Sequence, residues 1–353
     1  ILLFLVWNIV RLLASMLGGF SVNSVGMVMT FFLSFFLFYF IYDGFKSIDD
    51  FKSLYKLAAA LFSLLLVFSY VKLLTGNVEI VGLKMLNLNS TVVQMMNFLG
   101  IAAVAAGFDR RISIPWWLGL IVYFLVWIQI LLSTARATFL GSILSLLVVL
   151  FLNLLRHKKM LIISLIAIPI IAFSAFQVLS QSTGVIGEVF SGSLERVEKI
   201  SASTDDLAII FRFLSFDAAI QSIARNPLFG VGWNTGITVE ILGSLVMITV
   251  IDNTYLKLAK AHGLPSMLLY ISIFFIAYLA AFRTLRKIDW GLPRVILLTM
   301  VGTCVMANFV DLFQFNLAFF KPMVLVAFSL AGIMRISGES KNSQMLESGS
   351  LSK

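Results

Sequence analysis

The chain has 353 residues, of which 60% are hydrophobic and only 12% charged, and its mean hydropathy is +1.02. A soluble domain does not hide so large an apolar share, whereas lipid requires it, so the composition excludes an ordinary soluble enzyme and predicts a membrane protein. The net charge of +9 does not indicate nucleic-acid binding, because the basic residues lie in short loops between apolar runs. A single cysteine, Cys304, excludes an intrachain disulfide and disfavours a metal cluster.

About ten apolar runs are long enough to cross a bilayer on a window of roughly 20 residues. They lie near 1–17, 20–42, 57–74, 91–107, 113–133, 137–155, 160–180, 263–282, 293–310 and 317–335. The chain begins inside the first run without an initiator Met, so we expect a truncated start with earlier helices missing. The sequence therefore predicts an all-α polytopic membrane helix bundle of about ten spans.

Four short loops carry Lys or Arg and fall on one side of the membrane if the spans alternate. These loops are 43–56, 108–111, 156–159 and 283–289, and the polar tail after Arg335 joins them. The positive-inside rule makes this side the cytoplasm. The loops at 75–90, 181–262 and 311–316 then face outward, and the C-terminus is cytoplasmic.

This topology divides the chain into three parts. Residues 1–112 form the N-terminal transmembrane helices, and residues 113–336 form a membrane domain that includes the large outer loop 181–262. Residues 337–353 are polar, Ser-rich and without periodicity, so we expect a disordered tail. The outer loop is the one long segment without membrane character, and polar chemistry is expected there.

The first half of the outer loop predicts an amphipathic helix. Ser203 or Thr204 followed by two aspartates is a helix start signal, and residues 207–224 are apolar with interruptions at Arg212, Asp217 and Gln221. We expect this helix to lie on the membrane surface. It should end at Arg225–Pro227, because proline disfavours helix in the residue before it.

The second half of the loop combines glycines with another helix start. Gly230, Gly232 and Gly236 interrupt regular structure and let the backbone approach a ligand closely. The segment 237–250 is apolar but too short for a span. A second helix is expected to begin at Asp252 or Asn253, since either is a good N-cap. Its lysines, Lys257 and Lys260, suit lipid headgroups better than a ligand.

Three motifs follow one another in this half of the chain. They are STARATFLG (133–141), FRFLSFDAAIQSIARNPLFGVG (211–232) and DNTYLKLAKAHGL (252–264). Each is a weak signal alone. In this order, across one large outer loop of a many-helix protein, they resemble the O-antigen ligase/polymerase superfamily of bacterial membrane proteins. The resemblance covers about residues 130–335, and the first hundred residues match only in being helices.

The third motif departs from the pattern of the ligases at one position. Ligases of this superfamily commonly carry histidine where this chain has Asp252, and His262 lies ten positions further on. The aspartate version is associated with polysaccharide polymerases. The resemblance therefore implies a polymerase in preference to a ligase.

The resemblance also implies roles for three arginines of these motifs. Arg136 and Arg212 would grip a diphosphate, whose oxygens suit the two-pronged guanidinium. The alternative for Arg136 is an interface anchor that snorkels towards water. A lone arginine such as Arg212 in an apolar helix is costly unless it is paired or at the surface. Arg225 is a substrate-binding candidate, although its charge also suits a helix C-terminus.

Asp252 is the expected catalytic carboxylate. Neighbouring arginines favour its ionised form, which could accept a proton from an attacking sugar hydroxyl or orient it; the alternative is a simple helix cap. The remaining candidates for substrate binding are Gly230, Gly232, Asn253 and Tyr255. No metal-spacing cluster stands out, so no metal or cofactor is expected.

The reaction implied by the resemblance is metal-independent glycosyl transfer between undecaprenyl-diphosphate-linked saccharides on the outer face of the bacterial inner membrane. The product would be O-antigen, capsule or exopolysaccharide, and a flippase and a chain-length regulator would be partners. One alternative is a ligase that transfers glycan to lipid A core or to protein. Another is a polysaccharide or small-solute transporter, but the spans after residue 20 hold few of the mid-span acids that transporters use.

Overall fold

The computed structural model describes residues 1–17, 22–75, 90–109, 111–132, 136–154, 207–233, 236–241, 244–248, 251–313 and 320–350. Its helices in chain order are α1 (Leu2–Leu17), α2 (Val22–Gly44), α3 (Ile48–Thr75), α4 (Ser90–Gly107), α5 (Trp116–Leu132), α6 (Arg136–Leu154), α9 (Leu207–Arg225), α10 (Thr254–His262), α11 (Leu264–Leu285), α12 (Leu292–Asp311) and α13 (Phe320–Ser350). Two strands, β1 (Ile237–Ile241) and β2 (Ser244–Ile248), form an antiparallel pair.

Every predicted span except 160–180, which lies outside the described residues, coincides with one of these helices. Four helical segments of the described chain are long and apolar enough to cross a membrane: Ile48–Val71, Leu264–Leu285, Leu292–Asp311 and Met323–Ser340. Shorter apolar helices cover Leu2–Arg11, Phe35–Gly44, Val92–Gly107, Trp116–Ile130 and Ala137–Asn153. The helical membrane character is therefore confirmed, whereas the number of ten spans stays a prediction.

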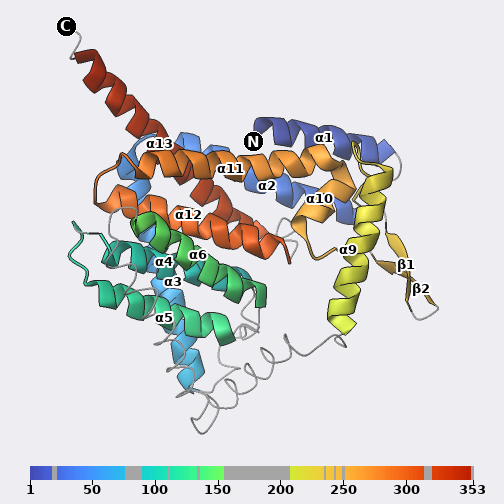
Figure 1. The fold of residues 1–353 in the computed structure, drawn as a ribbon, viewed down its shortest axis with the longest axis horizontal. Helices are drawn as coiled ribbons and strands as arrows, with labels where there is room; N and C mark the ends of the chain where they lie inside the picture. The colour runs from blue at the N-terminus through green and yellow to red at the C-terminus, as the bar shows by residue number, and fades with distance from the viewer. Residues whose placement is uncertain are drawn as a thin grey trace.

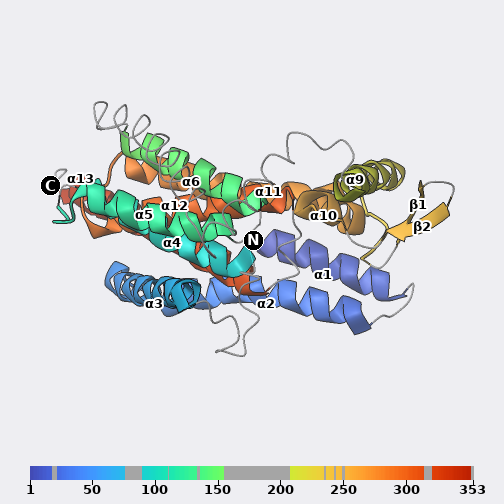
Figure 2. The ribbon, with the colours of Figure 1, turned by 90° about the horizontal axis from the view of Figure 1, so that it is seen from below.

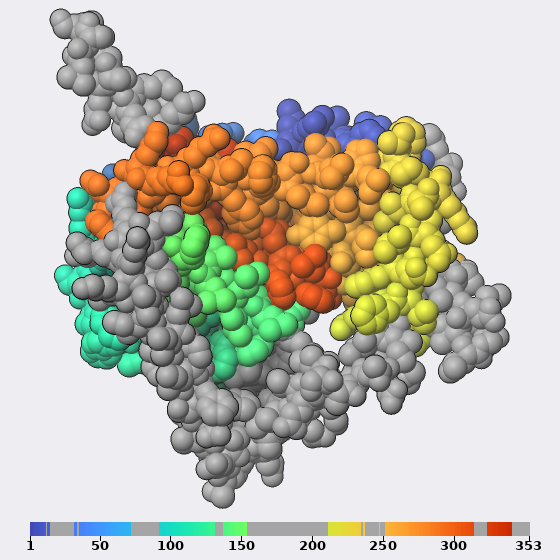
Figure 3. Space-filling model, viewed as in Figure 1, coloured from blue at the N-terminus to red at the C-terminus, as the bar shows by residue number. Residues whose placement is uncertain are grey.

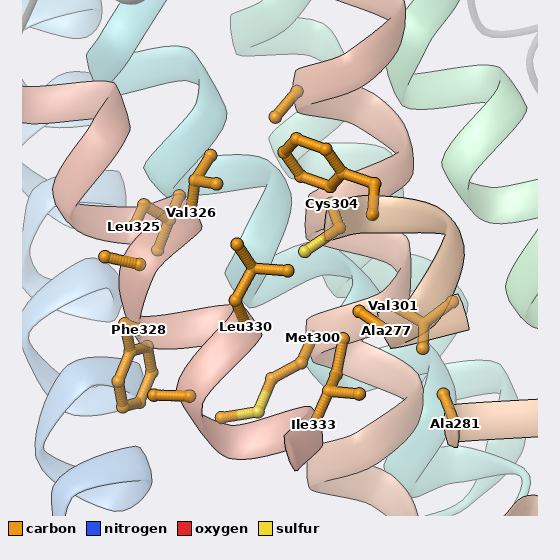
Figure 4. Close-up of a cluster of buried hydrophobic side chains, with 14 of the residues drawn as sticks. Ala277, Ala281, Met300, Val301, Cys304, Leu325, Val326, Phe328, Leu330 and Ile333 are labelled. Carbon is orange, nitrogen blue, oxygen red and sulfur yellow. The ribbon is translucent and has the colours of Figure 1, made fainter. Parts of the chain in front are cut away.

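Helix α12 is the most enclosed of the four described segments that are long and apolar enough to cross a membrane. It contacts α3, α4, α6, α11 and α13, and its Met300, Val301 and Cys304 are almost completely buried. Figure 4 shows these side chains facing residues of α13 and α11, among them Leu330 and Ala277. Close packing and interhelical hydrogen bonds hold such bundles together, because lipid tails are as apolar as the core itself.

The basic loops that the structure describes lie at one end of the bundle, whereas the orientation of this end in the membrane stays a prediction. The Gly291 N–H donates to Asp109 Oδ2 at 2.7 Å, which joins the α4–α5 connection to the α11–α12 connection. The guanidinium of Arg335 donates to the carbonyl of Tyr42 and so brings the end of α2 beside α13. Figure 1 shows these connections together at the left-hand end, where α13 projects outwards. Residues 156–159 lie outside the described residues.

The described part of the outer loop occupies the opposite end. In Figure 1 α9 runs across the ends of the membrane helices, with α10 beside it and the β-hairpin beyond. Figure 2 shows α10 and α11 in one layer and α1 with α2 in the layer beneath. In the space-filling view the yellow atoms of α9 run down the right-hand side of the coloured surface, beside α10 and α11 (Figure 3).

Helix α9 has the predicted amphipathic character. Its buried residues, Ser215, Ala219 and Ile223, recur every four positions and so share one face. Phe213 and Ile220 lie on the exposed side, which suits contact with lipid. The helix ends at Arg225, directly before Asn226-Pro227, as predicted. The predicted start signal at 203–206 lies outside the described residues.

Two features differ from the expectations. The segment around 237–248, which has no predicted structure, pairs as a hairpin with Ile237 opposite Ile248, so the outer loop is not purely helical. Both strands contain β-branched residues, four of the five in β1, and such residues favour strands. Residues 337–350, predicted to be disordered, continue α13 as a helix; adding residues to an existing helix needs no new nucleus.

Candidate functional site

The turn after α9 packs directly on the C-terminal half of α10. The N–H groups of Val231 and Gly232 donate to the carbonyls of Lys260 and Ala261, at 2.8 and 3.1 Å. The N–H of Leu264 donates to the carbonyl of Pro227 at 2.7 Å. The second and third predicted motifs, separate in sequence, therefore form one unit.

Glycine is required in this unit on both sides of the contact. Gly230 has φ +64°, and a Cβ there would lie 2.5 Å from the carbonyl oxygen of Lys260. Gly263 has φ +86°, and a Cβ there would overlap the carbonyl of Leu228. The close backbone approach that we predicted for a ligand at Gly230 and Gly232 is made here to α10. Ligand contact by these glycines stays a prediction.

The two outer-loop residues expected to be catalytic face each other. Arg212 Nε, from the second turn of α9, lies 3.6 Å from Asp252 Oδ2, two residues before α10 begins. Their side chains are 46% and 44% exposed, so both charges remain accessible from outside. An exposed ion pair contributes only about 0–1 kcal/mol to stability. The pair is thus poorly explained as a stabilising device.

Asn253, rather than Asp252, caps α10. Its Oδ1 accepts from the Leu256 N–H at 2.9 Å, as in a standard N-cap. Its Nδ2 donates to the carbonyl of Leu312, also at 2.9 Å. Since Asn253 fills the capping role, Asp252 is left to face Arg212.

Tyr255 points into the bundle. Its hydroxyl donates to the side-chain and main-chain oxygens of Asn308, at 3.2 and 3.3 Å. Burial, and to a smaller extent the charge of Asp311, raises the pKa of Tyr255 above its usual value. Direct substrate contact by Asn253 and Tyr255 stays a prediction.

Arg136 and Arg225 occupy helix ends. Arg136 is the first residue of α6, and Gly141, in the next turn of the same helix, packs against Met306 and Phe309 near the end of α12. The start of α6 and the start of α10 therefore both adjoin the last turns of α12. Arg225 is the last residue of α9 and is exposed, which fits both its predicted ligand role and a dipole contact.

The lysines of α10 do not lie where the sequence indicated. Lys257 and Lys260 are 5% and 1% exposed, so the expectation of lipid-headgroup contacts is wrong. Lys257 Nζ lies 5.8 Å from the ring centroid of Trp233, in a cation–π contact. Burial, and then the neighbouring charge of Lys257, lowers the pKa of Lys260 to about 8. Because lysines on a helix next to a membrane usually reach water, sequence alone does not signal this burial.

His262 ends the same helix inside the protein. Its ring stacks edge-on against Trp233 at 5.1 Å between centroids, and burial with the positive charge of Arg11 lowers its pKa to about 3. The imidazole is therefore neutral at physiological pH. Neither ring nitrogen has a hydrogen-bond partner among the described residues.

The carboxylate of Asp311 was not singled out in the sequence. It ends α12, is 2% exposed, and accepts hydrogen bonds from Thr254 Oγ1 at 3.0 Å and from the Tyr270 hydroxyl at 2.7 Å. An aspartate at the outer end of a span is expected at the boundary between membrane and water. The sequence therefore gives no signal for these contacts, and only the tertiary structure reveals them.

Within the described ranges, no three His, Cys, Asp or Glu side chains gather as a metal site would require. At the outer-loop end of the helical bundle an arginine, Arg212, does meet an aspartate, Asp252. These features define a multi-pass membrane protein with an arginine–aspartate site outside its apolar core.

Residues 121–271 match the family model described as O-antigen ligase. The match confirms the resemblance suggested by the three motifs: over these residues the chain is similar to the O-antigen ligase/polymerase superfamily. It includes Arg136, Arg212 and Asp252 and stops within α11. A comparison with curated proteins gave no match.

Proposed function

We propose that the protein is a polymerase of undecaprenyl-diphosphate-linked oligosaccharide repeat units at the outer face of the bacterial inner membrane. The acceptor hydroxyl attacks C1 of the donor sugar, a new glycosidic bond forms, and the bond to the diphosphate oxygen breaks. The hydroxyl proton passes to a base, and the lipid diphosphate leaves with the bonding electrons. Diphosphate is already a good leaving group, so this glycosyl transfer needs charge stabilisation more than activation by a metal.

The single observation that carries the proposal is the Arg212–Asp252 pair. It brings a fixed positive charge for the leaving group and a carboxylate for the incoming hydroxyl to one accessible place. When a diphosphate binds, the guanidinium of Arg212 turns towards it. The diphosphate carries more negative charge than the Asp252 carboxylate and accepts two hydrogen bonds from the guanidinium, so it competes well for Arg212. Asp252 is then released to accept the hydroxyl proton.

Other predicted residues complete this site. Arg136 supplies a second guanidinium to the diphosphate, and Arg225 with the Gly230–Gly232 turn contacts the saccharide or its phosphates. Asn253 and Tyr255 shape the edge beside Asp252. In this proposal residues 113–336 form the enzymatic membrane domain, the basic loops and the C-terminus are cytoplasmic, and a flippase and a chain-length regulator are partners.

The ligase reaction is the second candidate, and the description of the matching family model favours it. A ligase would transfer finished glycan to lipid A core or to protein with the same leaving group. The aspartate at position 252, in place of the histidine expected of ligases, supports the polymerase. The only histidine of the described residues, His262, is buried beneath Trp233.

The sugar profile of a deletion strain tests the proposal. Loss of the polymerase leaves single repeat units on the lipopolysaccharide, whereas loss of a ligase removes all glycan from the core. Complementation with Asp252→Asn should reproduce the deletion profile at normal protein abundance. A deletion strain with unchanged polysaccharide would refute both glycosyl-transfer functions.

A further inference from the structure

Two adjacent residues at the start of α10 are hydrogen-bonded to two adjacent residues at the end of α12. Thr254 Oγ1 donates to Asp311 Oδ1 at 3.0 Å, and Asn253 Nδ2 donates to the carbonyl of Leu312 at 2.9 Å. These contacts join positions 57 and 59 residues apart in the chain. The start of α10 is therefore fixed by the outer end of the central membrane helix.

The network reaches a third helix through the other oxygen of the same carboxylate. Tyr270, from the second turn of α11, donates its hydroxyl to Asp311 Oδ2 at 2.7 Å and is completely buried. One turn before Asp311, Asn308 accepts from Tyr255 and donates to Tyr278 at 2.6 Å. A carboxylate that accepts on both oxygens holds three helices in one arrangement.

We propose that Asp311 is a positioning residue that holds Asp252, through Thr254 and Asn253, at the distance from Arg212 that the reaction uses. The inference rests on the polymerase or ligase function proposed above, because both use Asp252 in the same role. Asp252 has no regular structure of its own, since it precedes the cap of α10. Its place is set by the two residues that follow it.

The chemistry explains why a carboxylate occupies position 311. Aspartate offers an acceptor oxygen to Thr254 and another to Tyr270. Asparagine has the same shape but replaces one acceptor by an NH₂ donor, so one hydroxyl must turn away or lose its partner. A buried carboxylate is costly unless its hydrogen bonds are made, so an apolar residue would serve better if packing were the only role of this position.

The test compares Asp311→Asn and Thr254→Val with the conservative Thr254→Ser, which keeps the hydroxyl. Each full-length protein is purified in detergent, its thermal midpoint is measured, and transfer is followed with a lipid-diphosphate-linked oligosaccharide. We expect kcat to fall about ten-fold for Asp311→Asn and Thr254→Val with KM nearly unchanged, because displacement of a reacting group by a fraction of an ångström slows the chemical step. Thr254→Ser should stay close to wild type.

Coupling to Asp252 separates positioning from a general structural role. Asp252→Glu keeps the carboxylate but shifts it by one methylene, so it should retain measurable activity. If Asp311 acts through Asp252, adding Thr254→Val to Asp252→Glu costs little more than Asp252→Glu alone. If the double variant instead loses activity by the product of the two single losses, the proposal is overturned. It is also overturned if Asp311→Asn and Thr254→Val only lower the thermal midpoint while the folded fraction keeps the wild-type kcat.

The outcomes also separate this inference from the function on which it rests. If Asp252→Glu slows transfer while Asp311→Asn and Thr254→Val do not, the catalytic assignment stands and Asp311 is not a positioning residue. If the wild-type protein transfers no sugar, the proposed function fails and the positioning role falls with it. If transfer is normal but Asp252→Glu has no effect, the reaction does not depend on the exact place of this carboxylate, and the positioning role fails alone.

Discussion

Arg212 and Asp252, forty positions apart in the chain, lie with Nε and Oδ2 only 3.6 Å from each other across the junction of α9 and α10. Each is nearly half exposed, so solvent screens their attraction and the pair adds little to folding. Substitutions at these positions should therefore change activity far more than stability. Because activity and stability should respond differently, activity measurements on these variants test the site directly.

Replacing Arg212 should show whether its geometry matters as well as its charge. Arg212→Lys keeps the charge but loses the two-pronged donor, and Arg212→Ala loses both. A charged hydrogen bond left unmade costs about 1.5–3 kcal/mol, which is roughly ten- to a hundred-fold in rate when it acts in the transition state. We expect Arg212→Lys to lose much of the transfer rate and Arg212→Ala nearly all of it, and Arg136 to behave alike.

Arg283→Ala is the matched control, because Arg283 is an exposed arginine at the other end of the bundle. It should polymerise like wild type. Membrane abundance is measured by immunoblot for every variant. Normal polymer from both Arg136→Ala and Arg212→Ala at normal abundance would disprove the hypothesis that these two arginines bind the diphosphate. Arg225 would then be the next candidate for that role.

The sequence predicts those parts of the site that depend on local chemistry. Asn253 has the side chain of an N-cap and acts as one, and Pro227 ends α9 where expected. The approach of Arg212 to Asp252 follows from the family motifs rather than from local pattern. The burial of Lys257 and the contacts of Asp311 depend on how α10 meets Trp233 and α12, and no local signal encodes that packing.

The orientation of the outer loop can be tested by cysteine labelling. Gln221 is exposed on α9, and Arg283 is exposed at the opposite end. In intact spheroplasts a membrane-impermeant thiol reagent should label Gln221→Cys and leave Arg283→Cys unlabelled. The native Cys304 is buried and gives a low background. Labelling of Arg283→Cys alone would reverse the topology and exclude an external site.

The contact between the two motifs predicts a strong effect of alanine at Gly230. The residue has a positive φ, and a Cβ would lie 2.5 Å from the Lys260 carbonyl oxygen, so the turn must move away from α10. We expect Gly230→Ala to lower both the thermal midpoint and the activity. Gly44→Ala is the control, since a Cβ there meets nothing within 4 Å. A fully stable Gly230→Ala protein would argue that the turn does not depend on this contact.

Transfer should not depend on a divalent metal ion if the arginines carry the charge of the leaving diphosphate. Purified protein treated with EDTA is expected to keep its rate. The measurement is the initial rate before and after chelation, and again after Mg²⁺ or Mn²⁺ is added. An EDTA-sensitive rate that either ion restores would mean that the arginines do not act alone.

The buried imidazole of His262 predicts a loss of stability in acid. Burial and the charge of Arg11 lower its pKa to about 3 in the folded protein, whereas in the unfolded chain it is near 6.5. Between these values the unfolded state binds a proton that the folded state does not, so stability falls as the pH falls below about 6.5. The slope for one such group approaches about 1.4 kcal/mol per pH unit. Above that range the histidine is neutral in both states and contributes no pH dependence.

The thermal midpoint of the purified protein, measured from about pH 7 to about pH 5, should therefore fall more steeply for wild type than for His262→Gln. Glutamine stays neutral throughout, so its baseline stability can differ while its pH slope is flatter. The carboxylates titrate in both proteins and cancel in the comparison. Equal slopes for the two proteins would mean that His262 is protonated in the folded state as readily as in the unfolded chain, and that the enclosure beneath Trp233 is looser than the structure indicates.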